Sequence, residues 1–403
     1  MSEVESSQRR EDSGMFRSLR HRNARIFFAG LMVSNIGSWL QFTATSYLLY
    51  DLRGRATDLG FNTMFQFLPM LLLGAWAGGF ADRHDRRTIA KWTQLIMAMQ
   101  AVFLGIADLT GNISIPLVYT ASLVLGIVSA IDNPARRGLV TELVEPHEIG
   151  NAMSLNTSVM TGSRVFGPAL AAMLISPLGT GWLFMLNGLS FFGIIGSLFM
   201  IKKSEMYSSP KAERTGKPVR DAFAYVRQDP ILLYSFIVFS VVSTFAFNYS
   251  VVLPKLSDIK WGYPGAFGWL LTVISIGSII GALATARLHK VTIGWFALCI
   301  CVCGVGSIAM AWSPNIWFAG VSGMVLGAGG TALVATMNAI SQQGTPPEMR
   351  SRMLALVAVA FLGSTPIGGP ITGWIADHIG IEWSLGYGGI AALLVVPLLK
   401  KAR

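Results

Sequence analysis

Charged residues are scarce in this sequence. Lysine, arginine, aspartate and glutamate make up 13% of the 403 residues, whereas hydrophobic residues make up 52%. Soluble domains are about one quarter charged, because water must solvate their surfaces. The shortage of charge therefore excludes an ordinary soluble enzyme or binding domain.

Residues that bind metals or carry covalent chemistry are also few. The three cysteines, Cys299, Cys301 and Cys303, lie two positions apart in one apolar stretch. On a helix such neighbours point about 200° apart, so we expect packing residues rather than metal ligands. The five histidines are scattered without ligand spacing, and no Gly-x-x-x-x-Gly-Lys-Ser/Thr phosphate-binding pattern is present. We expect no metal, no cofactor and no ATP-driven step.

Long uncharged segments are abundant instead. Five of them contain 23 to 26 residues between charged neighbours, and a transmembrane helix needs about 20. A transmembrane β-strand needs only about 10 alternating residues, so these lengths predict helices. The sequence therefore predicts an all-α polytopic membrane protein with twelve spans. The expected spans are 27–50, 58–81, 89–108, 113–132, 153–175, 180–201, 231–254, 265–287, 292–312, 316–339, 353–376 and 382–400.

The net charge of +10 follows from the orientation of these spans. With the N-terminus inside the cell, about 26 of the 31 lysines and arginines fall on cytoplasmic segments. This asymmetry is the positive-inside rule, so the basic charge indicates orientation and not a nucleic-acid partner. We expect both termini in the cytoplasm. The first span follows a polar, basic stretch without a cleavage site, which predicts a retained helix rather than a signal peptide.

A polar segment divides the chain into two similar parts. Its Ser, Pro and Lys content is typical of a linker, and Val219, Phe223 and Val226 repeat at helical spacing, which predicts an interfacial amphipathic helix. "EPHEIGNAMSL" with "FGPALAAML" is echoed by "TPPEMRSRMLAL" with "GGPITGW" about 200 residues later. We therefore expect a cytoplasmic tail over 1–26, a six-helix bundle over 27–201, a cytoplasmic linker over 202–230 and a second six-helix bundle over 231–403.

One short loop concentrates the charges. "GGFADRHDRR" resembles the signature loop between the second and third spans of the major facilitator superfamily, Gly-x-x-x-Asp-Arg/Lys-x-Gly-Arg/Lys-Arg/Lys, with Asp85 in place of the second glycine. The wider run that begins "LYDLRGRATDLG" and the segment "DNPARRGLVTELV" resemble the branch that contains bacterial siderophore and drug exporters of the enterobactin-exporter type. The resemblance implies two pseudo-symmetric six-helix bundles in the bacterial cytoplasmic membrane. The matching loop residues are Gly78, Asp82, Arg83, Arg86 and Arg87.

This loop is a candidate gate. A carboxylate at the N-terminus of a neighbouring helix stabilises it by about 0.3–1 kcal/mol. The resemblance implies that Asp82 caps the start of span 11, near Met353, in the outward-open state, and that the matching arginine pairs with an acid closing span 4, for which Asp132 is the candidate. Contacts made in one conformation bias a two-state equilibrium. The alternative is a basic turn that only follows the positive-inside rule.

Arg164 is a charge near the centre of a span. Its insertion costs about 2.5–3.5 kcal/mol, so a functional role is the default interpretation. It could bind an anionic substrate in a central cavity, or it could bond to carbonyls loosened by the following Gly-Pro. "GSRVFGPALAA" resembles the antiporter signature of span 5, with Ala171 where that pattern has glycine. Each half has such a Gly-Pro pair for helix packing, Gly167–Pro168 and Gly369–Pro370.

Polar residues recur at helical spacing in three spans. Because polar groups avoid lipid, such stripes point inward, where they line the route or bond adjacent helices. The aromatic residues Trp39, Phe42 and Phe247 offer contacts for a ring-bearing substrate or serve as core. The stripes are Ser34, Ser38, Gln41 and Thr45 in span 1, Asn62 and Gln66 in span 2, and Thr244 and Asn248 in span 7.

These features predict a secondary active transporter rather than an enzyme. We expect a monomer that exports a small amphipathic molecule, such as a siderophore or drug, by alternating access. The resemblance implies proton coupling, although the acids nearest the first bundle's interior, Asp51 and Asp132, fall at the ends of expected spans. An uptake symporter of the same fold and a non-transporting sensor or scaffold remain alternatives.

Overall fold

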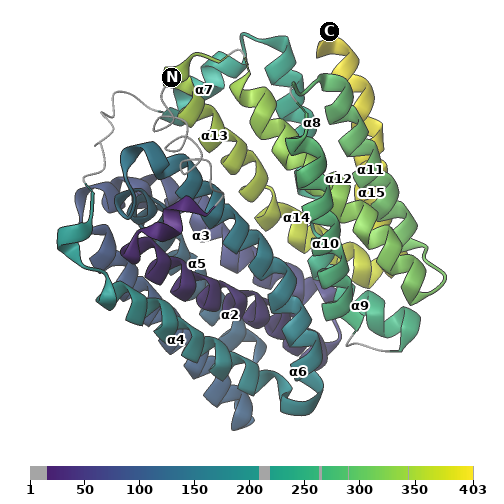
Figure 1. Ribbon diagram of the computed structural model, residues 1–403. Coiled ribbons are helices and arrows are strands. Elements are labelled where there is room, and N and C mark those ends of the chain that lie inside the picture. Colours follow the sequence, from purple (N-terminus) through teal and green to yellow (C-terminus); the bar gives the residue numbers. More distant parts are fainter. Residues whose placement is uncertain (1–15, 208–217, 263–265, 289, 344, 403) are drawn as a thin grey trace, which may run out of the picture.

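Helices make up most of the described chain. The computed structural model describes residues 16–207, 218–262, 266–288, 290–343 and 345–402, and the regular elements in these ranges are all helices (Figure 1). They are η1 (Arg17–Arg20), α2 (Arg22–Arg53), α3 (Ala56–Arg83), α4 (Arg86–Leu109), α5 (Ile115–Glu142), η2 (Pro146–Glu148), α6 (Ile149–Met200), η3 (Lys203–Glu205), α7 (Pro218–Val226), α8 (Pro230–Ala246), α9 (Tyr249–Trp261), α10 (Ala266–Ala286), α11 (Ile293–Ala311), α12 (Ile316–Gln342), α13 (Pro347–Leu362), α14 (Thr365–His378), α15 (Ile381–Val395) and η4 (Val396–Ala402).

The helices account for the twelve spans expected. Ten stretches of the described chain are long and apolar enough to cross a membrane, and the bent α3 raises the number to eleven. One of the ten contains α6, whose 52 residues break at Gly179, where φ is +77°. Asn151 near the start of α6 bonds to Ser18, and Lys202 just after its end bonds to Asn23. Both ends of α6 therefore lie together, and α6 is two spans running in opposite directions.

Side chains accept hydrogen bonds from the first-turn amides of several helices. The Asp85 carboxylate accepts a hydrogen bond from the Thr88 amide at 2.8 Å at the start of α4. The Asn315 side chain accepts one from the Phe318 amide at 2.9 Å at the start of α12. Such caps pair backbone donors that have no partner within the helix. At the other end of a helix, Gly54 closes α2 with φ +67°, a left-handed conformation that favours glycine.

The helices pack as two groups. In the first half, α2 and α4 pack on α6 and α3 packs on α5; in the second half, α12 packs on α10 and α11, and α11 on α15. The groups meet where α3 lies against α14 and α6 lies against α10. Figure 1 shows that the halves converge at the end that carries α9 and diverge toward the end that carries α7. We call these the far end and the linker end.

Glycines allow the helix backbones of the second half to touch. A Cβ added to Gly277 would lie 2.0 Å from the Met324 carbonyl oxygen, and one added to Gly281 would lie 2.0 Å from that of Ala328. Small residues produce such close approach in membranes, where apolar side chains gain little from contacting each other rather than lipid.

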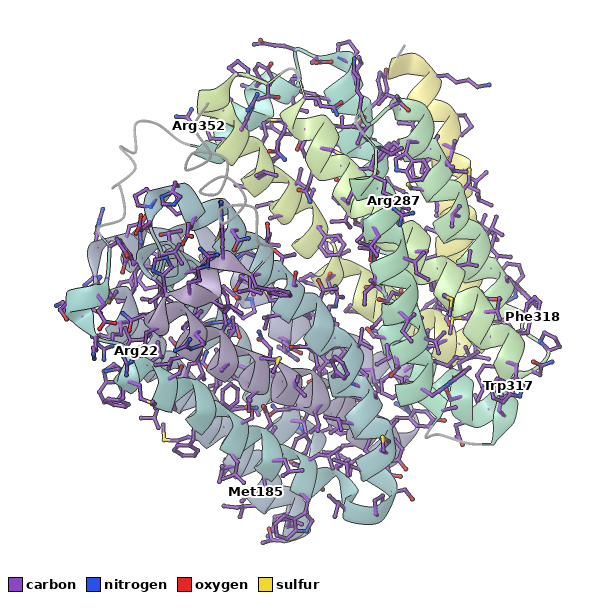
Figure 2. All side chains as sticks on the ribbon, viewed as in Figure 1. Arg22, Met185, Arg287, Trp317, Phe318 and Arg352 are labelled. Carbon is purple, nitrogen blue, oxygen red and sulfur yellow. The ribbon has the colours of Figure 1, made fainter. Side chains whose placement is uncertain are left out.

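Large apolar side chains cover the outside. Trp317, Leu394 and Met173 are each more than 70% exposed, and Figure 2 shows Trp317 and Phe318 at the edge of the second half. A soluble monomer rarely exposes apolar surface on this scale. The exposed belt matches the lipid contact predicted from the uncharged segments.

The amphipathic helix expected near the end of the linker is α7. Ala222 and Val226 are buried, and α7 packs against α13 and α8, whereas Phe223 is 53% exposed. One side of α7 thus packs on the second half, while Phe223 of the predicted apolar face stays exposed. The side chain of Val219 lies outside the described residues.

Candidate functional site

One face of α6 is polar although this helix crosses the membrane. Beyond Arg164, toward the far end, α6 is packed against the second half. A Cβ added to Gly268 of α10 would lie only 2.5 Å from the Ala172 Cβ. Exposed polar groups on a spanning helix face a water-filled space rather than lipid. We infer that this face lines a cleft between the halves that opens toward the linker end. Its exposed or half-buried residues are Ser154, Thr157, Ser158, Thr161 and Arg164.

Arg164 is the cation of this cleft. Its guanidinium carbon lies 4.8 Å from the centre of the Trp39 ring, and its backbone oxygen accepts a 3.0 Å hydrogen bond from Ser275 Oγ of α10. Within the described residues, the Arg164 side chain has no carboxylate partner and donates to no backbone carbonyl. An exposed guanidinium that lies on an aromatic face without a counter-ion can bind an anion.

Aromatic pairs from both halves flank Arg164. A cavity of about 100 Å³ adjoins it, lined in part by Phe247 and Phe361 of the second half, whose rings meet edge to face at 5.2 Å. In the first half, Trp39 and Phe42 form a similar pair at 5.4 Å. A site with one cation and several ring surfaces suits an amphipathic molecule that carries a negative group.

A more polar cavity of about 150 Å³ lies inside the first half. Many of the polar residues predicted in span 1 face it, and Gln41 accepts a 2.6 Å hydrogen bond from Asn187 Nδ2 and donates to Gln100 at 3.2 Å. Asn62 accepts a 2.6 Å hydrogen bond from the hydroxyl of Ser122, and Ser122 lines the cavity. The lining residues include Ser34, Ser38, Gln41, Gln66, Asp132 and Arg136.

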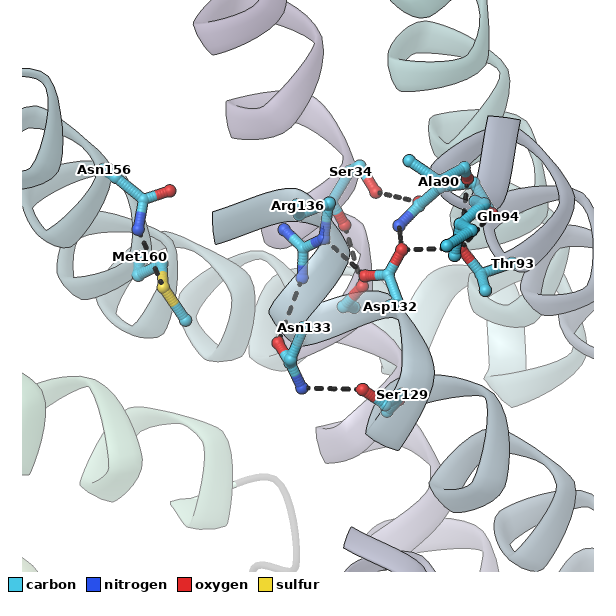
Figure 3. A network of polar contacts seen from close by, with 12 residues as sticks. Ser34, Ala90, Thr93, Gln94, Ser129, Asp132, Asn133, Arg136, Asn156 and Met160 are labelled. Carbon is cyan, nitrogen blue, oxygen red and sulfur yellow. Dashed lines mark hydrogen bonds and ion pairs between the residues drawn. The ribbon is translucent and has the colours of Figure 1, made fainter. Parts of the chain in front are cut away.

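Asp132 is the buried carboxylate of this cavity, with 1% of its surface exposed. It accepts hydrogen bonds from the Thr93 hydroxyl at 2.7 Å and from Gln94 Nε2 at 3.0 Å, and it forms an ion pair with Arg136 one turn later on α5. Figure 3 shows these side chains converging on the carboxylate, with Ser34 bonded to Gln94 above it in this view. Asp132 is thus a fully bonded carboxylate at the edge of a polar cavity.

The predicted gating loop joins α3 to α4 at the linker end. Gly78 and Asp82 belong to the last turns of α3, and Arg83 ends this helix with an exposed side chain. Arg87 donates to the Leu198 carbonyl oxygen at 2.7 Å, which ties α4 to the end of α6. Asp85 takes the position of the family's second glycine with ordinary negative φ and caps α4.

The pKa of Asp85 lies below its usual value. Partial burial raises the pKa, but hydrogen bonds from the Thr88 amide and hydroxyl and the positive charge of Lys203 outweigh that effect. The carboxylate at this position is therefore charged at neutral pH and serves as the cap of α4.

In the described conformation a loop arginine pairs with an acid other than Asp132, whose expected pairing belongs to the outward-open state. Arg86 contacts Glu142 at 2.9 Å and Asp82 at 3.2 Å. Glu142 is the last residue of α5, whereas Asp132 lies well inside this helix and pairs with Arg136. The expectation placed the end of span 4 at the end of its uncharged run, but α5 continues past two arginines to Glu142.

The remaining predicted residues lie at helix contacts. A Cβ on Gly167 would lie 2.3 Å from the Trp39 Cβ, and the neighbouring Pro168 carbonyl would lie 3.0 Å from a Cβ on Gly268. Gly369 and Pro370 meet Gly60 of α3, with 2.5 Å between a Gly60 Cβ and the Gly369 oxygen. Thr244 and Asn248 lie against Gly368 of α14, and Asn248 donates to the Thr244 carbonyl at 2.6 Å.

Sequence reasoning missed two groups of residues. The polar face of α6 between Ser154 and Thr161 repeats at three- and four-residue spacing, so the signal was in the sequence. Arg136 follows Asp132 at the four-residue spacing of a helix, so this signal was also in the sequence. Glu142 carried no local signal, because its partner Arg86 lies 56 positions away.

Comparisons with known proteins agree with this architecture. The family model described as transmembrane secretion effector matches residues 13–403. The staphyloferrin A transporter of Staphylococcus aureus is 20% identical over 92% of this chain and 94% of its own length. Macrolide efflux protein A of Streptococcus pyogenes is 23% identical over 93% and 95%. A bacterial homologue of the human lysosomal transporter Spinster, solved in an inward-facing and occupied conformation, superposes with a TM-score of 0.68 at 15% identity, covering 95% of each chain.

Proposed function

The chain belongs to the transmembrane secretion effector family of the major facilitator superfamily, and on this basis we propose that it is a secondary active exporter of a small amphipathic anion. One observation carries the anionic preference. Arg164 is an exposed cation in the cleft between the halves, without an acidic partner in the described chain and flanked by aromatic pairs. The names of the relatives, staphyloferrin A transporter and macrolide efflux protein A, support transport of small molecules, and the second name supports efflux.

The orientation follows from charge. The linker end carries most of the lysines and arginines, which the positive-inside rule assigns to the cytoplasm. The chain then lies in the bacterial cytoplasmic membrane with both termini inside, and the described conformation has its cleft open to the cytoplasm. An exporter loads cargo in this state and releases it after the cleft closes at the linker end and opens at the far end.

Asp132 is the proposed proton carrier. The proposal rests on position: Asp132 is a buried carboxylate that lines a polar cavity and pairs with Arg136. Protonation would leave Arg136, one turn later on the same helix, without its counter-ion. In this proposal the protein is a monomer, uses no cofactor and makes or breaks no covalent bond in its cargo.

Matched cargo molecules test the anionic preference. Membrane vesicles turned inside out would be energised and supplied with amphipathic carboxylates and with their neutral methyl esters. We expect accumulation of the acids over the esters, collapse with an uncoupler, and loss of the preference in Arg164→Ala. Arg55→Ala removes an exposed arginine at the far end and serves as the control.

Three results would contradict the proposal. Equal transport of acid and ester would remove the role of Arg164. Accumulation in right-side-out vesicles alone would favour an uptake symporter, and no flux of any compound by correctly folded protein would favour a sensor or scaffold.

A further inference from the structure

The start of α3 is capped by the other half of the molecule. Asp377, near the end of α14, accepts hydrogen bonds from the Ala56 amide at 3.0 Å, the Thr57 amide at 2.8 Å and the Thr57 hydroxyl at 2.6 Å. The first amides of a helix have no partner within it. Arg55, the residue before α3, provides no side-chain cap. The second half thus supplies the cap that the local sequence of α3 lacks.

A lysine completes this contact. Lys255 of α9 forms an ion pair with the same Asp377 carboxylate, and the two side chains are 14% and 9% exposed. Close by, the Tyr50 hydroxyl of α2 donates to Asp258 of α9 at 2.7 Å. We call the contact of Asp377 with Ala56, Thr57 and Lys255 the cross-half cap.

The helix backbones are in contact beneath the cap. A Cβ on Gly373 would lie 2.5 Å from the Ala56 carbonyl oxygen, and a Cβ on Gly60 would lie 2.5 Å from that of Gly369. Gly369, Gly373 and Asp377 are spaced four apart and share one face of α14. Because the contact is this tight, α14 cannot move away from the start of α3 without breaking the cap.

We propose that Asp377 is a gating residue that holds the far end closed while the cleft is open at the linker end. The inference rests on the proposed transport cycle, because it assigns the cap to one of its two states. A contact made in one state shifts the equilibrium toward that state by its own free energy. Opening the far end separates Asp377 from α3 but leaves it paired with Lys255, since both belong to the second half. The carboxylate therefore never becomes an isolated charge, and the gate can open at modest cost.

The gate carboxylate is largely shielded from solvent. At the far end, the Asp377 carboxylate is 9% exposed and crosses between the halves. The closed state at the far end thus depends on an acid from α14, which no motif in the sequence indicates.

Distances across the far end test the proposal. Spin labels at exposed Asn112 and Pro314, which lie on different halves, would report the opening in the purified, full-length protein in lipid nanodiscs, with the three native cysteines replaced by alanine. A helix cap and its charge together correspond to a shift of about tenfold. We expect Asp377→Asn to raise the ratio of far-end-open to far-end-closed molecules about tenfold. Thr57→Val, which removes the hydroxyl donor but keeps both amides, should shift it in the same direction by a smaller factor.

Asp51→Asn is the matched control, because it removes an exposed carboxylate at the same end. The proposal is overturned if Asp377→Asn lowers the unfolding temperature but leaves the distances unchanged, or if Asp51→Asn produces the same shift. If Asp377→Asn does not fold, an unchanged distribution in Thr57→Val overturns it. The distances are measured without cargo, so a protein that transports nothing would refute the proposed function and leave this test intact.

Discussion

Replacing Asp132 with asparagine is expected to separate proton coupling from cargo movement. Asparagine has nearly the same shape and can still accept from Thr93 and Gln94, but it cannot take up a proton and leaves Arg136 without its counter-ion. Gradient-driven accumulation should therefore fall at least about tenfold, whereas exchange of labelled for unlabelled cargo, which needs no net proton movement, should stay within about twofold of wild type.

The cost in stability follows from the hydrogen bonds and the ion pair of Asp132. Hydrogen bonds to a charged group contribute about 1.5–3 kcal/mol and neutral ones about 0.5–1.5 kcal/mol. Weakening the bonds of Asp132 and leaving a cation unpaired should lower the free energy of unfolding by about 1–3 kcal/mol. Most molecules would remain folded, so the transport assay can be interpreted.

The assay uses purified protein in liposomes with an imposed pH gradient. Asp108→Asn is the control, because it makes the same change in the same half, at a carboxylate that accepts from Thr180 at the far end. Accumulation by Asp132→Asn at the wild-type level would refute the reasoning. Equal loss of accumulation and exchange would show instead that Asp132 serves cargo binding or folding.

Three further predictions concern other parts of the molecule. Arg164→Ala should weaken binding of an anionic cargo about 10- to 100-fold, and Arg164→Lys should weaken it less, because lysine keeps the charge but not the stacking on Trp39. Equilibrium binding measures the affinity of both variants, and equal losses of affinity would contradict the prediction. Gly373→Leu should force α14 away from Ala56 and open the far end in the spin-label assay. Gly74→Leu should leave the far end closed, because nothing in the described chain lies within 4 Å of a Cβ added to Gly74. Asp85→Ala should lower the free energy of unfolding by about 1 kcal/mol at neutral pH. Since the pKa of Asp85 is lowered in the folded protein, the stabilisation by its carboxylate is present above the unfolded pKa of about 3.9 and disappears as pH falls through the folded value. Unfolding temperatures of wild type and variant that differ equally at every pH would contradict this.

Much of the architecture could be predicted because its signals are local. An uncharged run long enough to cross a bilayer is visible in the sequence, and so is the polar linker between two similar parts. The stripe of Ser34, Ser38 and Gln41 could be placed on one helix face by spacing alone, and these residues do line a common cavity.

The rest depends on where helices end and on contacts between distant segments. Asp132 was assigned to a helix end because charges follow it, but the nearest of them, Arg136, neutralises it inside the helix. Arg86 meets Glu142 through the packing of α4 on α5. Asp377 reaches Ala56 across 321 positions. Composition cannot show which charges are paired and therefore tolerated inside a membrane.

Cargo direction tests the central claim, that the cleft beside Arg164 loads an anion from the cytoplasm for export. Inside-out and right-side-out vesicles from the same cells would be energised and given one labelled amphipathic carboxylate at equal concentration. The account predicts uncoupler-sensitive accumulation in the inside-out vesicles, lost in Arg164→Ala, and none in the right-side-out vesicles. Accumulation confined to the right-side-out vesicles would contradict it.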